Sequence, residues 1–124
     1  MDEWMKEAKA HESAPHIGMY LTHNGIVRKS AKAKVRHGQE GTPDVLGMYF
    51  SYDEAKVEEY VQNTYRMEGI YYVNVWLNEG ELSVGDDIMY VLIGGDIRPH
   101  VIEALQYLVG KLKNECVTEQ EIYK

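Results

Sequence analysis

The sequence predicts an α+β domain, with a mixed or antiparallel sheet that is packed by two main helices. The expected elements follow in the order β–β–α–β–β–α, and the hairpin-like joins between strands favour this class. The run IMYVLIGG, residues 88–95, is almost continuously apolar, which indicates a strand buried on both faces. The chain has 124 residues, of which 44% are hydrophobic, so it can form one domain around a single core.

We divide the chain into an N-terminal arm, residues 1–16, that forms a short helix or frays, and one domain over residues 17–124. Residues 17–28 read IGMYLTHNGIVR and suit a strand, in which Gly25 marks a bulge or a close backbone approach. Residues 29–43 are polar and contain glycine and proline. We expect a long basic loop here, mobile without a ligand and ordered over an anion.

The middle of the chain predicts a helix between two strands. Residues 45–50 suit a short strand. Ser51 and Glu54 have the spacing of a capping box, which satisfies backbone amides at the start of a helix, and Gly69 is suited to end that helix. Residues 70–77, IYYVNVWL, are rich in β-branched and aromatic side chains and predict the next strand.

The final helix shows the clearest periodicity in the sequence. Its apolar face recurs every 3.6 residues and consists of Ile97, Val101, Ala104, Leu105, Leu108, Val109 and Leu112. Asp96 is expected to cap the N-terminus, and Pro99 falls in the first turn, where a missing amide hydrogen costs little. Lys111 and Lys113 fall in the last turn, where cations complement the helix dipole.

The charge of the chain is unevenly distributed. With 13 basic and 20 acidic residues the net charge is −7, which argues against nucleic acid as a partner. Five positive charges and no acid lie in RKSAKAKVR, residues 28–36, a segment that either captures a small anion or forms a solvated loop. No apolar run reaches the roughly 18 residues of a membrane helix, and the polar N-terminus is unlike a signal peptide. We therefore expect a cytoplasmic protein that contacts no membrane.

The sequence lacks the common motifs of catalysis and metal binding. It has no phosphate-binding glycine loop, no nucleophile elbow and no helix with paired histidines. The single Cys116 excludes an internal disulfide and a multi-cysteine metal site, and the five histidines are scattered. We expect no metal and no cofactor. The unusual features that remain are the basic loop and three cations at helix ends, Arg98, Lys111 and Lys113.

Three stretches together resemble a known family. The first is GMYLTHNGIVR, residues 18–28, with G-x-V-R at its end; the second is EGELSVGDDI, residues 79–88. The third begins with DIR, residues 96–98, and ends with GKLK, residues 110–113. At these separations they are similar to the opening strand, the turn before the buried strand and the final helix of the large, catalytic subunit of molybdopterin synthase, the MoaE-like family.

The resemblance implies an α/β hammerhead-like fold and a homodimer. In that family the large subunit takes the Gly-Gly tail of a small ubiquitin-like sulfur-carrier subunit, and the two subunits form a heterotetramer. Sulfur passes from the thiocarboxylate of the tail to cyclic pyranopterin monophosphate, which forms the dithiolene of molybdopterin. By resemblance, Lys113 is the catalytic residue, and the substrate-binding residues are Arg28, Arg98, Lys29 and Lys111.

Two departures from the family pattern leave other interpretations open. A family lysine falls on Gln120 here, and a family histidine falls on Ile97. The first alternative is a non-catalytic module on the same fold that binds an anion or a partner. The second is a chance match of α+β patterns.

The position of Lys113 suits a catalytic role on physical grounds. It lies about 100° around the helix from Leu112, so its stem can cover apolar surface while its amine points into a cleft at the helix end. If Arg28 and Arg98 converge on that cleft, their permanent charges favour the neutral, nucleophilic form of the amine.

Overall fold

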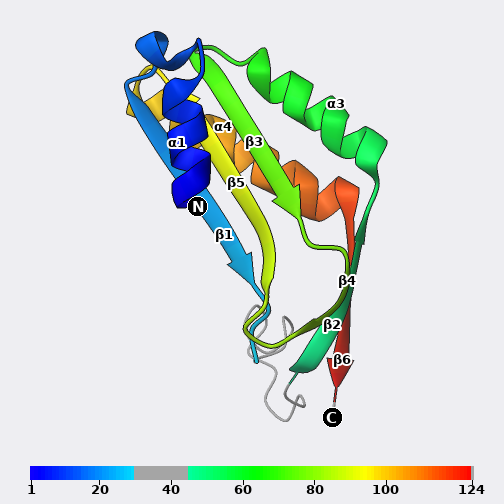
Figure 1. The fold of residues 1–124 in the computed structure, drawn as a ribbon. Helices are drawn as coiled ribbons and strands as arrows, with labels where there is room; N and C mark the ends of the chain where they lie inside the picture. Colours follow the sequence, from blue (N-terminus) through cyan, green and yellow to red (C-terminus); the bar gives the residue numbers. More distant parts are fainter. Residues whose placement is uncertain (30–44, 124) are drawn as a thin grey trace.

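The computed structural model describes residues 1–29 and 45–123, which form two three-stranded antiparallel sheets and three α-helices (Figure 1). The helices are α1 (Asp2–Ala10), α3 (Glu54–Tyr65) and α4 (Arg98–Lys111). The strands are β1 (Met19–Ile26), β2 (Val45–Tyr52), β3 (Ile70–Leu77), β4 (Gly80–Ser83), β5 (Asp87–Gly95) and β6 (Val117–Tyr123). A 3-10 turn, Ala14–His16, follows α1, and a π-helical turn, Leu112–Cys116, follows α4.

The predicted α+β class is confirmed. The basic loop expected over residues 29–43 lies, from residue 30 onward, outside the described residues.

The first sheet has β5 at its centre, between β1 and β3. Val91 of β5 is opposite His23 of β1 and Val75 of β3. The helix α4 covers one face of the sheet and α1 the other, where the Tyr20 hydroxyl donates to the Ala8 carbonyl (Figure 1). The sheet is therefore covered on both sides, and β5 is buried on both faces as its apolar sequence predicted.

The second sheet, in the order β4-β2-β6, was not foreseen as a separate layer. Its two edge strands were missed: β4 has only four residues, and β6 reads VTEQEIY, whose polar letters suggested a tail. In the structure β6 alternates between half-buried and exposed positions along β2, with Glu119 opposite Phe50 and Glu121 opposite Met48. Residues 117–123 have little apolar content, and they form a strand because they pair with β2, which is distant in the sequence.

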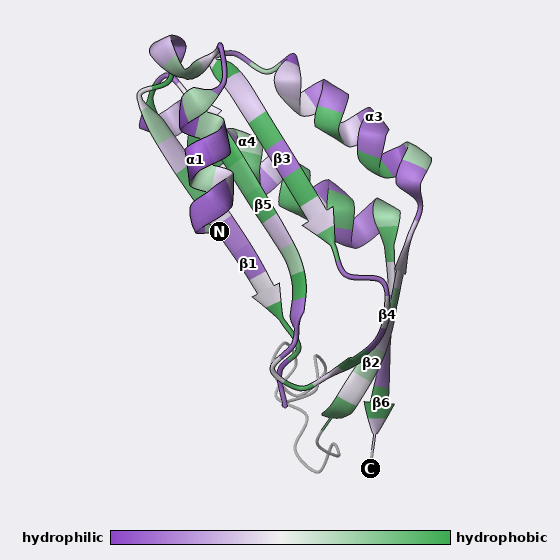
Figure 2. Cartoon of the chain, in the orientation of Figure 1, coloured by the Kyte–Doolittle hydropathy of each residue, from purple (hydrophilic) through white to green (hydrophobic). Residues whose placement is uncertain are grey.

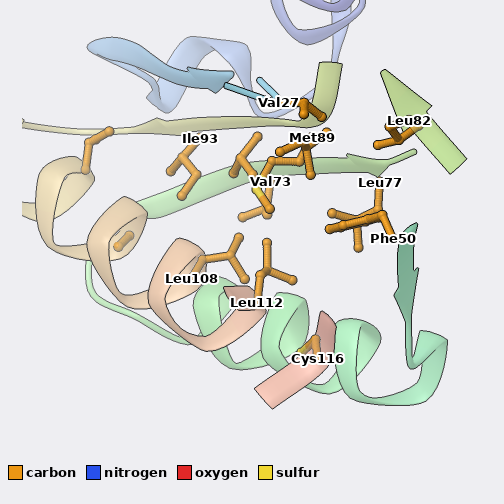
Figure 3. Close-up of a cluster of buried hydrophobic side chains, with 14 of the residues drawn as sticks. Val27, Phe50, Val73, Leu77, Leu82, Met89, Ile93, Leu108, Leu112 and Cys116 are labelled. Atoms are coloured by element: carbon orange, nitrogen blue, oxygen red, sulfur yellow. The ribbon is translucent and has the colours of Figure 1, made fainter. Parts of the chain in front are cut away.

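The core lies between α4, α3 and the two sheets. Leu108 of α4 and Leu112 of the π-helical turn are fully buried against the first sheet, and Phe50 of β2 closes the core from the second (Figure 3). Figure 2 shows this division by hydropathy, since β5 is largely hydrophobic while α1 and α3 carry many hydrophilic residues. Ile97, predicted to belong to the apolar face of the last helix, is instead 52% exposed, because it precedes the first helical turn.

Two predicted helix caps are wrong. Ser51 is still paired in β2, so Asp53 caps α3 instead, and its carboxylate accepts a hydrogen bond from the Lys56 amide at 3.2 Å. At the start of α4 the N-cap is Ile97, which provides no side-chain cap. The carboxylate of Asp96 accepts from the Ile97 amide at 2.6 Å and contacts the ring of His100.

The contact between Asp96 and His100 couples folding to pH. Oδ1 of Asp96 and Nδ1 of His100 are 2.7 Å apart, and this hydrogen bond raises the pKa of His100 and lowers the pKa of Asp96. A raised histidine pKa stabilises the fold fully below the unfolded value of about 6.5 and loses this effect as the pH rises through the folded pKa. The Asp96 contribution is present above its unfolded value of about 3.9 and is lost as the pH falls through the folded pKa.

We therefore expect His100→Gln to lower the melting temperature more at about pH 5.5 than at about pH 9, because the stabilising charge pair exists only in the first condition. Melting followed by circular dichroism at the two pH values measures the difference. His11→Gln is the control, since Nδ1 of His11 bonds the hydroxyl and the backbone amide of Ser13, and its ring contacts the ring of Tyr72. Equal losses for His100→Gln at both pH values would contradict this assignment.

Candidate functional site

A small pocket of about 70 Å³ opens where the two sheets meet. We call it the junction pocket. It is lined by Ile26, Arg28, Met48, Ile88, Lys113, Glu119 and Glu121. Its lining comes from both sheets and from the π-helical turn, so the pocket exists only when the chain is folded.

Arg28 is held at the pocket by its neighbours in the chain. Val27 is buried, and its backbone donates to the Asp86 carbonyl and accepts from the Gly85 amide, at 3.0 and 2.8 Å. The carbonyl of Lys29 accepts from the Val45 amide at 2.8 Å. Hydrogen bonds on both sides therefore fix the backbone at Arg28, which lines the pocket.

Lys113 reaches the same pocket from the π-helical turn. The sequence predicted it in the last turn of an α-helix, but α4 ends at Lys111 and the wider turn follows. Leu112 and Cys116, both buried, anchor that turn to the core (Figure 3). Such π-turns are frequent at functional sites, because the extra residue redirects side chains. Burial also raises the pKa of the Cys116 thiol, which suits a packing role for that residue.

Two carboxylates that no sequence motif indicated share the pocket with these cations. Glu119 and Glu121 lie on one face of β6, with Gln120 between them on the other. The alternation E-x-E inside a strand was the signal that could have revealed them. Among the described residues the pocket lining thus has two basic and two acidic side chains, and the formal charges of these four balance.

The other predicted site residues lie elsewhere. Arg98 is the first residue of α4 and Lys113 lies just beyond its end, so about 22 Å separate them along the helix axis, and they do not meet within one chain. Lys111 is also outside the pocket: its Nζ is 3.4 Å from the Glu115 carboxylate and 5.7 Å from the centre of the Tyr60 ring. Of the predicted cations, only Arg28 and Lys113 line the junction pocket.

Gln120 faces away from the junction pocket. It borders a shallow surface hollow on the outer side of the second sheet, together with Tyr49 and Thr118. The position of the absent family lysine is therefore not next to Lys113 in this chain.

His23 of β1 is a further polar group near Lys113. Burial of its ring and, to a lesser extent, the positive charge of Lys113 lower the pKa of His23. Its Nε2 atom is buried and has no hydrogen-bond partner among the described residues.

The part of the chain that the structure describes offers no cluster of three or more metal-ligating side chains. In this same part, no helix has the length and apolar character needed to cross a bilayer.

Several solved structures superpose on this chain over nearly its whole length. Molybdopterin synthase from Staphylococcus aureus superposes with a TM-score of 0.75 at 15% identity, over 100% of this chain and 85% of that chain. The molybdopterin biosynthesis MoaE protein from Burkholderia ambifaria MC40-6 gives 0.73 at 19% identity, over 100% and 79%. A complex of subunits 1 and 2 of molybdopterin-converting factor from Helicobacter pylori 26695 gives 0.67 at 17% identity, over 98% and 82%. No curated protein matches the sequence significantly.

These identities are low enough that the superpositions establish the fold alone. The sequence itself supplies the family, because the family model described as MoaE protein matches residues 2–115, nearly the whole chain. The chain belongs to the MoaE protein family.

Proposed function

We propose that this protein acts in molybdenum cofactor biosynthesis as the large subunit of molybdopterin synthase. In this proposal it transfers sulfur from the C-terminal thiocarboxylate of a small ubiquitin-like subunit to cyclic pyranopterin monophosphate, which forms the dithiolene. The observation that carries the proposal is the meeting of Arg28 and Lys113 in one pocket of a MoaE-family chain. The Helicobacter pylori complex of two subunits supports a small partner.

The chemistry of the two cations fits these substrates. The thiocarboxylate and the phosphate are both anions, and a guanidinium such as that of Arg28 binds such groups through two parallel hydrogen bonds. The primary amine of Lys113 serves as nucleophile or proton donor, a role that a guanidinium cannot fill. Lys29, Arg98 and Lys111 lie outside the junction pocket and remain predicted substrate-binding residues. Arg98, at the far end of α4, cannot reach the junction pocket of its own chain.

A homodimer is part of the proposal. The first sheet leaves Tyr71 and Trp76 of β3 40% and 38% exposed, although α1 and α4 cover much of its two faces. Exposed aromatic side chains on one strand favour a protein interface. We expect light scattering at micromolar concentration to give about twice the monomer mass of 14.3 kDa. A mass near that of one chain would contradict the homodimer.

A non-catalytic module on the same fold is the second candidate, and one observation favours it. Glu119 and Glu121 place two carboxylates in the pocket that must hold anionic substrates. Like charges repel, so these carboxylates weaken anion binding relative to a pocket that contains only cations.

Binding of cyclic pyranopterin monophosphate, measured by titration calorimetry, tests the assignment of the pocket. We expect Arg28→Ala to weaken binding by about 1–3 kcal/mol, the loss for one charged hydrogen bond, and Glu119→Gln with Glu121→Gln to strengthen it. Arg66→Ala is the control, because this arginine bonds Asn63 on α3. Equal affinities for wild type and Arg28→Ala would place the binding site elsewhere.

A further inference from the structure

The inward face of β1 carries an imidazole, that of His23, near the junction pocket. Along β1, Leu21, His23 and Gly25 point to the side that α4 covers, while Thr22 and Asn24 are exposed. Gly25 has no side chain, and the His23 ring lies over the space this leaves: a Cβ built on Gly25 would be 3.7 Å from Nε2 of His23.

The same space links His23 to the pocket lining. The Cβ built on Gly25 would also be 3.8 Å from Cβ of Ile88, which lines the junction pocket, and 3.3 Å from Cγ of Met89. The Nε2 atom of His23 and the Cβ atom of Ile88 therefore border the same space, so that His23 lies close to the lining of the pocket without being part of it. Buried polar atoms usually have a hydrogen-bond partner, and Nε2 has none among residues 1–29 and 45–123. We therefore expect Nε2 to gain a hydrogen-bond partner from a bound ligand or from a side chain that moves.

Lys113 is the group whose charge reaches this imidazole. Burial and the charge of Lys113 both lower the pKa of His23, so the ring is neutral at pH 7. Lys113, from the π-helical turn, is the charged group that acts on the ring. Arg28, after β1, and Glu119 and Glu121, from β6, line the junction pocket together with Lys113. From β5, Val91 is the register partner of His23 and Met89 borders the space beside Gly25; neither side chain titrates. A neutral imidazole with an open ring nitrogen is a suitable acceptor for an ammonium group.

We propose that His23 is a positioning residue for Lys113, whose ammonium group donates a hydrogen bond to Nε2 when the junction pocket is occupied. This inference rests on the proposed function. The bond holds the amine toward the reacting thiocarboxylate and away from the two glutamates that share the pocket. It also requires the tautomer with hydrogen on Nδ1, since Nε2 must present its lone pair. When His23 is protonated at acidic pH, the bond is lost and two cations repel.

Nitrogen-15 NMR of the imidazole rings tests the pairing without any turnover. We expect the Nδ1–H tautomer for His23 in the wild-type protein, and a higher His23 pKa in Lys113→Met, which removes the neighbouring charge. Addition of cyclic pyranopterin monophosphate should shift the Nε2 resonance in the wild type and not in Lys113→Met. An Nε2–H tautomer, or a His23 pKa that is the same in both proteins, would overturn the inference.

Kinetics of sulfur transfer provide the second readout. His23→Phe should lower kcat about tenfold or more with little change in KM, the effect of losing one hydrogen bond to a charged group, while His23→Gln should retain most of the rate through its side-chain oxygen. The acid limb of the wild-type pH profile should be absent in both variants. Full activity of His23→Phe with an unchanged profile would overturn the positioning role and leave the proposed function standing. The expected NMR results without any sulfur transfer would instead contradict the proposed function alone.

Discussion

Lys113→Ala is expected to abolish sulfur transfer, with a loss of about 10²–10⁴-fold in kcat, the range for a group that moves a proton in the transition state. The side chain lines the junction pocket, and alanine leaves neither a nucleophile nor a proton donor there. Folding should be unaffected, because the buried anchors of the π-helical turn are Leu112 and Cys116. Single-turnover reaction with a thiocarboxylated small subunit measures the rate, and circular dichroism measures the fold.

Two further variants show which property of Lys113 matters. Lys113→Arg keeps the positive charge but has no nucleophilic amine, so it should be nearly as inactive as Lys113→Ala while still binding the anionic substrate. Lys9→Ala, in α1 and remote from the pocket, is the matched control and should keep wild-type turnover. If Lys113→Ala kept the wild-type turnover, the catalytic role of Lys113 would be contradicted and the non-catalytic module would be favoured.

Phe50→Ala is expected to have the largest effect on stability, a loss of about 3–5 kcal/mol in the free energy of unfolding. Phe50 is 2% exposed and lies at the centre of the second sheet, from which it points into the core shared with Leu77 and Leu82 (Figure 3). Truncation leaves a cavity where the two sheets meet, next to the junction pocket. Urea denaturation measures the change.

The neighbouring residue supplies the control for this substitution. Tyr49 lies on the opposite face of β2 and is 52% exposed, so Tyr49→Ala removes a similar aromatic side chain at a cost of about 0.5 kcal/mol or less. If Phe50→Ala and Tyr49→Ala destabilise equally, the second sheet does not share the core of the first.

The strand β5 and the helix α4 could be predicted because a local pattern of apolar residues marks each of them. The apolar run of β5 indicated a strand buried on both faces, and the periodicity of α4 indicated a helix that buries one face. The capping signal at Ser51 was wrong because pairing with β6 extends β2 past that residue. The strand β6 was missed for the same reason, since its partner is far away in the sequence and its own residues are largely polar.

The site was predicted in part. The resemblance supplied Arg28 and Lys113, but no spacing in the sequence shows that they share a pocket, because tertiary folding brings them together. The expected convergence of Arg98 with them fails within one chain because the rigid length of α4 keeps its two ends apart. Glu119 and Glu121 appear as pocket residues only once β6 is known to be a strand.

The most direct test of the account is reconstitution of the complete reaction. The wild-type protein is incubated with a thiocarboxylated small subunit and cyclic pyranopterin monophosphate, and the dithiolene product is assayed. The account predicts product that depends on this protein and consumption of the thiocarboxylate in step with it. Stable binding of both substrates with no dithiolene formed would contradict the sulfur-transfer function and identify the protein as a non-catalytic member of its family.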